Sequence, residues 1–233
     1  FAINSDAPEL MARYAASQGA SLLHFSTDYV FDGEKQGAYL EEDLTNPLGV
    51  YGASKLAGEQ AIAKAFESQP STGCYAILRT SWVYGDGGNF IRTILRLAKE
   101  RSSLRVIDDQ HGVPTSATWL AELGLNLMLD GDRPRVFQSG IYHAVPRGVT
   151  NWYQLACLTV QTALEFGWAL QLDRSAIIPI PASEYPLPAP RPMNSCLLVA
   201  KLQFELERLD LVSKLPHWNT PWDKQVLSYV KHL

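Results

Sequence analysis

The feature that most constrains this fold is an alternation of short apolar runs with longer helical patterns in the first half of the chain. Residues 20–25 and 75–79 are apolar runs of strand length, and residues 51–66 between them are rich in Ala, Lys, Glu and Gln. Strands that alternate with helices indicate parallel strands joined by crossovers. The sequence therefore predicts an α/β fold with a doubly wound, Rossmann-type parallel sheet, in which residues 20–25 are buried on both faces.

The remaining patterns extend this prediction to the C-terminus. Ser5 is expected to cap a helix that carries Pro8 in its first turn and ends at Gly19. We divide the chain into residues 1–108, which carry the parallel-sheet pattern, and 109–233, mainly a smaller lobe with some elements that return to the sheet. Other predicted elements are helices over 89–100, 115–129 and 150–166, strands over 104–107 and 141–145, two short helices within 199–233, and an irregular proline-rich stretch over 179–192.

Composition excludes several classes of function. The formal net charge is −4, with 46% hydrophobic and 19% charged residues, and no basic block indicates a nucleic-acid partner. The apolar runs are too short to cross a bilayer. Cys74, Cys157 and Cys196 are an odd number and far apart, which argues against a disulfide framework or a zinc site. We therefore expect a cytoplasmic protein that binds neither nucleic acid nor membrane.

Tyr51 and Lys55 are the first residues that indicate chemistry. They lie one helical turn apart, so both side chains are expected on one face. When a hydride reaches a carbonyl carbon, the resulting alkoxide needs a proton, and a lysine charge is expected to lower the pKa of a tyrosine that donates it. Such a pair also arises by chance, but Ser26 and Thr27 end the preceding strand, where open α/β sheets bind ligands. Their hydroxyls either cap the strand end or contact the substrate carbonyl, and with the Tyr/Lys pair they favour an enzyme site.

Several motifs then carry a family resemblance that spans almost the whole chain. The sequence resembles the dTDP-4-dehydrorhamnose reductases, which are extended short-chain dehydrogenase/reductases. The matching motifs are Phe25-Ser-Thr-Asp-Tyr-Val-Phe-Asp-Gly33, Asn46-Pro-Leu-Gly-Val-Tyr-Gly-Ala-Ser-Lys-Leu-Ala-Gly-Glu59, Leu78-Arg-Thr-Ser-Trp-Val-Tyr84, Asp109-Gln-His-Gly-Val-Pro-Thr115, Trp152-Tyr153 and Arg191-Pro-Met-Asn-Ser195.

The resemblance implies a reaction, a coenzyme and a set of site residues, with residues 1–108 as the remaining part of a dinucleotide-binding Rossmann domain and 109–233 mainly as a substrate-binding lobe. NADPH or NADH reduces the C4 carbonyl of dTDP-4-dehydro-L-rhamnose, so the expected partner is a dTDP-sugar. Tyr51 is the expected proton donor, Lys55 holds the nicotinamide ribose and lowers the Tyr51 pKa, and Thr27 completes the catalytic set. Phe25, Tyr51 and Lys55 are the expected cofactor contacts. The expected substrate contacts are Thr27, Asp28, Trp82, Arg191, Asn194 and Ser195, of which Trp82 can instead pack in the core, Arg191 can be a solvated charge, and Asp28 and Asn194 can cap turns.

The sequence also departs from the family pattern. No Gly-x-x-Gly-x-x-Gly turn, the usual cradle for a coenzyme pyrophosphate, occurs in the 233 residues, which suggests an N-terminally truncated fragment, and the residues that choose between NADPH and NADH are not visible. Some family members hold Mg²⁺ at a dimer contact through glutamates, but Ser116–Trp119 and the last helix supply none, since Asp223 is the only acid there. We therefore expect no metal and a monomer or weak homodimer.

Two other functions remain open at this stage. One is a reductase-like binding subunit that regulates methionine adenosyltransferase without turnover, although the retained Tyr51, Lys55, Thr27 and Trp82 favour an enzyme. The other is a different nucleotide-sugar enzyme of the same superfamily, such as an epimerase or a dehydratase. Dehydratases usually carry an acidic pair after the threonine, and here only Asp28 follows Thr27.

Overall fold

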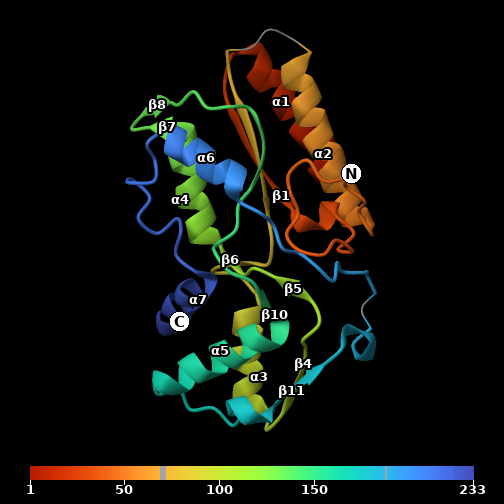
Figure 1. Cartoon of the computed structure of the whole chain (residues 1–233), viewed down its shortest axis with the longest axis vertical. Helices are drawn as coiled ribbons and strands as arrows, with labels where there is room; N and C mark the ends of the chain where they lie inside the picture. Colours follow the sequence, from red (N-terminus) through yellow and green to blue (C-terminus); the bar gives the residue numbers. More distant parts are fainter. Residues whose placement is uncertain (69–71, 187) are drawn as a thin grey trace.

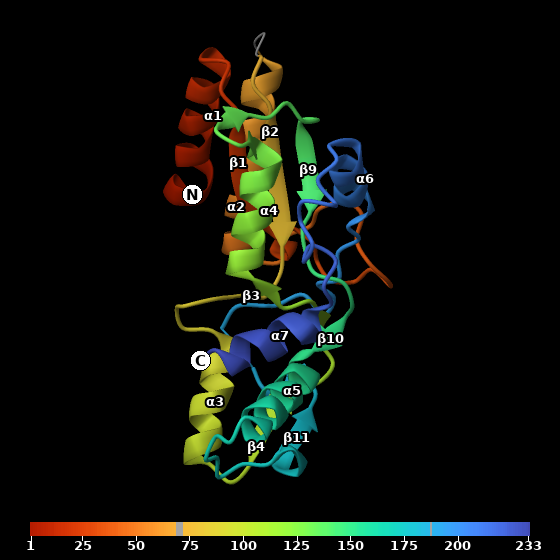
Figure 2. The ribbon, with the colours of Figure 1, turned by 90° about the vertical axis from the view of Figure 1, so that its left-hand side faces the viewer.

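The computed structural model of this chain describes residues 1–68, 72–186 and 188–233. These residues form a three-stranded parallel sheet with helices on both faces (Figures 1 and 2), as the sequence predicts. The strands follow the order β1 (Leu22–Thr27), β2 (Tyr75–Thr80) and β9 (Gly140–His143); the helices are α1 (Ala7–Ser17), α2 (Val50–Glu67), α4 (Ala117–Met128) and α6 (Ala200–Arg208).

The central strand β2 shows why the sheet is covered on both sides. Ile77 packs into one apolar cluster with Ile62 and Phe66 of α2 and with the alanines of α1. Its neighbours Ala76 and Leu78 point to the opposite face and pack with leucines of α4 and α6. Because side chains alternate along a strand, an uninterrupted apolar strand buries residues against two helical layers.

A second group of elements lies below the ends of β1 and β2 (Figures 1 and 2). Helices α3, α5 and α7 enclose an apolar cluster, and the parallel pair of β4 and β11 closes its far side. The bounds are α3 (Phe90–Glu100), α5 (Trp152–Glu165), α7 (Trp222–Lys231), β4 (Leu104–Ile107) and β11 (Ile177–Ile180); short strands are β3 (Val83–Tyr84), β5 (His111–Gly112), β6 (Thr115–Ser116), β7 (Leu129–Asp130), β8 (Arg133–Pro134) and β10 (Thr150–Asn151).

The packing does not follow the chain order around residue 108. Helix α3 and strand β4 come before it, yet they pack with α5 and β11 in the second group. Helices α4 and α6 and strand β9 come after it and pack on the three-stranded sheet. The division of the chain at residue 108 therefore describes the sequence pattern and not the two groups of packed elements.

Three local expectations differ from the structure. The first helix does not begin with a Ser5 cap, because the π-helical turn η1 (Ala2–Asp6) runs directly into α1 and Asn4 is held by Ser54 of α2, with Asn4 Nδ2 3.0 Å from Ser54 Oγ. Strand β1 is an edge strand, so Phe25 is exposed and not buried on both faces. The expected irregular stretch 179–192 begins within β11, where Pro179 is tolerated because the strand has one neighbour; Leu187 lies outside the described residues.

No helix in the described part of the chain is long and apolar enough to cross a membrane.

Candidate active site

The carboxyl end of β1 places a hydroxyl and a carboxylate side by side. Thr27 ends the strand and caps the short 3₁₀ helix η2 (Asp28–Val30), where its hydroxyl accepts a hydrogen bond from the Tyr29 amide at 3.2 Å. The same hydroxyl donates to Asp28 Oδ1 at 3.0 Å, and both side chains are buried. The other oxygen of Asp28, Oδ2, is buried and has no hydrogen-bond partner among the described residues. It is an open acceptor at the strand end.

Tyr51 and Lys55 come to this strand end from the first turns of α2. The Tyr51 ring is about half exposed and meets the Tyr29 ring edge to face at 5.8 Å. Helix and strand end approach closely because Gly52 has no Cβ, which would lie 2.1 Å from the Tyr29 carbonyl oxygen. The Lys55 ammonium donates to the Phe25 carbonyl at 2.6 Å and lies 3.1 Å from His24 Nε2. The predicted pair therefore shares one helix face, directed at the end of β1.

The electrostatics of the pair differ from the expectation. Burial raises the pKa of Tyr51 above its usual value, a hydrogen-bonding contact with Thr27 lowers it in part, and the nearby Asp28 charge raises it. Burial lowers the pKa of Lys55, and the Glu59 carboxylate opposes that shift. The predicted lowering of the Tyr51 pKa by Lys55 is thus wrong for this structure, because the ammonium is directed at Phe25 and His24. Burial also raises the pKa of Asp28 to about 6.

A cleft of about 340 Å³ collects side chains from both groups of elements. The ends of β1 and β2 form one wall, Tyr51 lies at the start of α2, and Trp152 and Arg191 come from the second group. Thr80 adds a buried hydroxyl that has no partner among the described residues. The lining residues are Ser26, Thr27, Asp28, Tyr29, Tyr51, Thr80, Ser81, Trp82, Val83, Trp152 and Arg191.

Trp82 stands in the cleft in an unusual backbone conformation. Its φ of 47° lies in the left-handed region, which a bulky residue adopts only where its surroundings hold it. Its indole stacks on the indole of Trp152, with ring centroids 3.7 Å apart and planes 16° from parallel. Behind the ring lies Gly112, where a Cβ would come within 2.6 Å of the Trp82 side chain. Trp82 therefore lines the cleft with a fixed ring, and its partly buried side chain also packs against the apolar cluster of α3, α5 and α7.

The Arg191-to-Ser195 motif divides between the cleft and the support behind it. Arg191, the expected contact of the nucleotide sugar, is exposed and lines the cleft. Ser195 is buried, and its hydroxyl acts on the Asp28 carboxyl, whose pKa it lowers. The Asn194 amide donates to the carbonyl oxygens of Lys35 and Gly37 at 2.8 and 2.7 Å. The structure therefore does not bring Asn194 into the cleft, because its side chain ties this segment to the loop after η2.

Sequence reasoning missed three residues beside the predicted set. Tyr29 and Trp152 line the cleft, and Glu59 forms a buried ion pair with Arg79 of β2. Ser26 donates its hydroxyl to Glu59, so it does not point at a substrate as its position suggested. The available signals were the four-residue spacing of Lys55 and Glu59 and the presence of an arginine inside an apolar strand.

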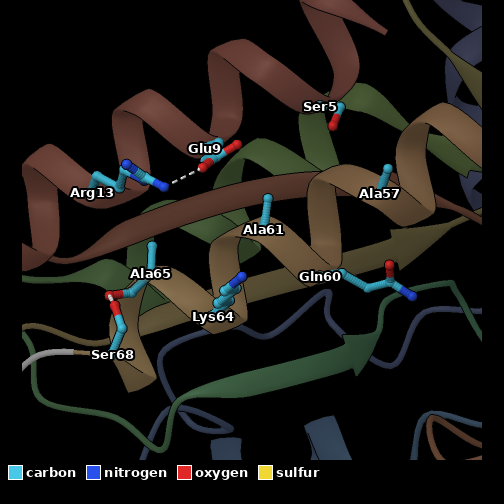
Figure 3. A pocket seen from close by; sticks show the side chains of 9 residues that line it. All are labelled: Ser5, Glu9, Arg13, Ala57, Gln60, Ala61, Lys64, Ala65 and Ser68. Atoms are coloured by element: carbon cyan, nitrogen blue, oxygen red, sulfur yellow. Dashed lines mark hydrogen bonds and ion pairs between the residues drawn. The ribbon is translucent and has the colours of Figure 1, made fainter.

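A second cavity, of about 690 Å³, lies between α1 and α2 (Figure 3). Figure 3 shows it bordered by alanines of α2 and by the Glu9–Arg13 ion pair, whose charged atoms are 2.7 Å apart. It contains no group of the predicted site. Nor do three or more His, Cys, Asp or Glu side chains gather in a metal-binding arrangement anywhere in the described ranges.

Parallel α/β topology with a Tyr/Lys pair at the strand ends defines the class: this is the fold and site of a short-chain dehydrogenase/reductase. A family model, the RmlD substrate binding domain, matches residues 1–227. The chain belongs to this family, that of the dTDP-4-dehydrorhamnose reductases.

Individual relatives agree with this assignment. The chain is 43% identical over 218 residues to the dTDP-4-dehydrorhamnose reductase of Escherichia coli K12, covering 93% of this chain and 68% of that protein. It is 40% identical over 220 residues to the enzyme of Burkholderia thailandensis, covering 93% and 70%.

Solved structures give the same result. A dTDP-4-dehydrorhamnose reductase from Clostridium acetobutylicum superimposes with a TM-score of 0.79 at 30% identity, over 98% of this chain and 71% of that chain. One from Bacillus anthracis, in complex with NADP, has a TM-score of 0.76 at 29% identity, over 97% and 70%. A dTDP-glucose 4,6-dehydratase from the same organism, at 14% identity with a TM-score of 0.73, shares the fold alone.

Proposed function

We propose that this protein reduces the C4 carbonyl of dTDP-4-dehydro-L-rhamnose to give dTDP-L-rhamnose, with NADPH or NADH as the reductant. The observation that carries the proposal is the convergence of Thr27, Tyr51, Trp82 and Arg191 on one cleft. Relatives at about 40% identity are named as this reductase, and one neighbouring structure holds NADP. The choice between the two coenzymes stays open.

The residues at the strand ends fit the nicotinamide end of such a coenzyme. The Lys55 ammonium has three N–H groups, and the described residues accept from two of them, which leaves one for a ribose hydroxyl. Phe25 contributes its carbonyl to the orientation of Lys55, while its ring lies exposed. A glycine-rich turn for the pyrophosphate is not among the 233 residues.

We assign the proton transfer to Tyr51. A bound nicotinamide would supply a hydride to the carbonyl carbon, which would leave the negative charge of an alkoxide on the carbonyl oxygen. Tyr51 then donates its phenolic proton to that oxygen, and its raised pKa keeps the phenol protonated at neutral pH before the transfer. The Thr27 hydroxyl contacts the same phenol, and it stabilises the phenolate that is left once its single proton turns from Asp28 Oδ1 to the phenolate oxygen. Lys55 adds a positive charge on the same side of the helix.

The rest of the cleft recognises the nucleotide sugar. Asp28 Oδ2, buried and without a partner among the described residues, accepts a hydrogen bond from a sugar hydroxyl. The Trp82 ring stacks on Trp152 through one face and packs against the sugar ring with the face that this stack leaves free. Arg191 pairs with a diphosphate oxygen, because a guanidinium matches phosphate geometry. Ser195 acts through Asp28.

We also propose a cellular location and an oligomeric state. Cytoplasmic activity is supported by three buried cysteines that are all free thiols. We retain a monomer or weak homodimer as the oligomeric state, to be measured by analytical ultracentrifugation over a range of concentrations.

The direct test follows NADPH oxidation with dTDP-4-dehydrorhamnose, using protein expressed from its complete reading frame. Tyr51→Phe removes only the donating hydroxyl, and we expect kcat to fall about 10²- to 10⁴-fold, the usual contribution of a general acid. Tyr185→Phe makes the same chemical change at an exposed residue outside the cleft and should leave the rate unchanged. Full turnover by Tyr51→Phe would exclude Tyr51 as the proton donor.

A further inference from the structure

Two residues of β1 face two residues of α2 in matched pairs. His24 and Ser26 are two positions apart on the strand, so both point to the same side of the sheet. Lys55 and Glu59 are four positions apart on the helix, so they also share a face. Two strand residues advance about 6.6 Å and four helix residues about 6 Å, so the pairs can align. His24 meets Lys55, and Ser26 meets Glu59.

The position of the Ser26–Glu59 pair is fixed by an ion pair with a neighbouring strand. Arg79 of β2, which pairs with Ser26 in the sheet register, donates from Nη2 to Glu59 Oε2 at 2.6 Å and from Nε to Glu59 Oε1 at 3.0 Å. All three side chains are buried. A buried two-pronged ion pair has a single geometry, so it sets the position of α2 along β1. The position of α2 along β1 therefore places Lys55 beside His24.

The contact with Lys55 defines the protonation state of His24. An ammonium only donates hydrogen bonds, so His24 Nε2, 3.1 Å away, must be the acceptor and the imidazole neutral. Burial and the Lys55 charge lower the pKa of His24 to about 4, which agrees with a neutral ring near pH 7. Lys55 is the charged group that acts on the ring, while Glu59, one turn further along α2, is paired with Arg79 of β2. Helix α4 packs on the opposite face of β1, against Leu23 and Phe25.

We propose that His24 is a positioning residue for Lys55: together with the Phe25 carbonyl it occupies two N–H groups of the ammonium and directs the third toward the coenzyme ribose. This inference rests on the role proposed above for Lys55 in the reductase. His24 itself does not line the cleft. Its removal should therefore act on coenzyme binding and on the rate, and not on binding of the sugar.

The first test measures the pair without any coenzyme. An NMR titration of the histidine ring protons should give His24 a pKa near 4, and Lys55→Met should raise it because one of its two causes is removed. The burial of the ring remains in that variant, so the pKa should stay below the usual 6.5. An unchanged His24 pKa in Lys55→Met would overturn the contact.

The second test compares His24→Phe with His24→Gln. Phenylalanine keeps a flat ring but has no acceptor, whereas the glutamine side-chain oxygen can take the place of Nε2. We expect His24→Phe to weaken NADPH binding and to lower kcat, each about tenfold, the size of one hydrogen bond to a charged group, with an unchanged Kd for the dTDP-sugar. His24→Gln should restore most of both losses.

The outcomes separate this inference from the proposed function. Equal losses in both variants, or a parallel loss of sugar binding, would show that His24 acts only on general packing and would overturn the proposal. No NADPH oxidation by the wild type with dTDP-4-dehydrorhamnose would refute the proposed function, while the NMR titration would still report whether Lys55 and His24 are paired. Circular dichroism melting of each variant checks that the fold is retained.

Discussion

At the scale of single residues, the site combines open acceptors and donors with one rigid aromatic plate. Asp28 Oδ2 and the Thr80 hydroxyl are buried at the strand ends without partners in the described ranges, which is costly in an ordinary core and expected where a polar ligand binds. Trp82 is held by its stack on Trp152, whose Nε1 donates to Gln110 Oε1 at 3.2 Å. The cleft is thus preorganised for a polar ligand.

The role of the Trp82 ring in sugar binding can be tested through Gly112, which packs against it. In Gly112→Ala the new Cβ would lie 2.6 Å from the Trp82 ring, so the indole must move. We expect KM for the dTDP-sugar to rise about tenfold, or roughly 1.4 kcal/mol, while the coenzyme KM changes little. The near-ultraviolet circular dichroism from the stacked indoles should change as well.

Gly87→Ala serves as the matched control, because nothing lies within 4 Å of a Cβ at that position. If Gly112→Ala and Gly87→Ala gave the same sugar KM, the close packing of Trp82 would have no part in sugar binding.

At the scale of elements, the position of helix α2 along β1 determines where the side chains of the site lie. The buried Glu59–Arg79 pair and the missing Cβ at Gly52 together place Tyr51 against Thr27. The first four residues of the strand are only partly buried or exposed. The burial of β1 is concentrated at Ser26 and Thr27, the end that carries the site.

The buried pair should matter for stability. Glu59→Gln leaves the Arg79 charge buried and uncompensated, and we expect the free energy of unfolding to fall by about 3–5 kcal/mol in a urea titration. Glu9→Gln removes one partner of an exposed ion pair on α1 and should change it by less than about 1 kcal/mol. Equal effects of the two substitutions would contradict the role given to Glu59.

At the scale of the whole molecule, the cleft exists only where two groups of elements meet. The ends of β1 and β2 point toward α5 and the segment after β11 (Figure 2), and Trp152 and Arg191 come from that side. Residues that are more than a hundred positions apart, such as Tyr51 and Arg191, therefore line one cavity.

The pH dependence of stability also belongs to this scale. His143 is fully buried between the sheet and the loop after η2, and burial lowers its pKa to about 3. Between pH 6.5 and 3 the unfolded chain binds a proton at this residue that the folded protein does not. Stability should therefore be lost as pH falls from 6.5 toward 3, and His24 acts in the same direction. Asp28, with its raised pKa, acts in the opposite direction between about pH 4 and 6.

Urea unfolding at pH 7 and pH 5 measures this effect. We expect the wild type to lose on the order of 2–3 kcal/mol between the two values, since each pKa unit corresponds to about 1.4 kcal/mol, both histidines contribute, and the Asp28 contribution offsets part of the loss. His143→Phe should lose less over the same interval, whereas His217→Gln, at an exposed position, should behave like the wild type. An identical pH dependence in His143→Phe would rule out the buried imidazole as its source.

The sequence by itself determined the features that depend on near neighbours in the chain. The alternation of strands and helices predicted the parallel α/β fold, and the four-residue spacing of Tyr51 and Lys55 predicted their common face, because strand and helix periods are local properties. The position of Thr27 at a strand end followed for the same reason. Tertiary structure decided what depends on distant segments. It turned Asn194 away from the cleft and into the support of a loop, directed Lys55 to His24 and not toward Tyr51, and stacked Trp82 on Trp152. These outcomes depend on contacts between residues tens of positions apart, which no local pattern encodes.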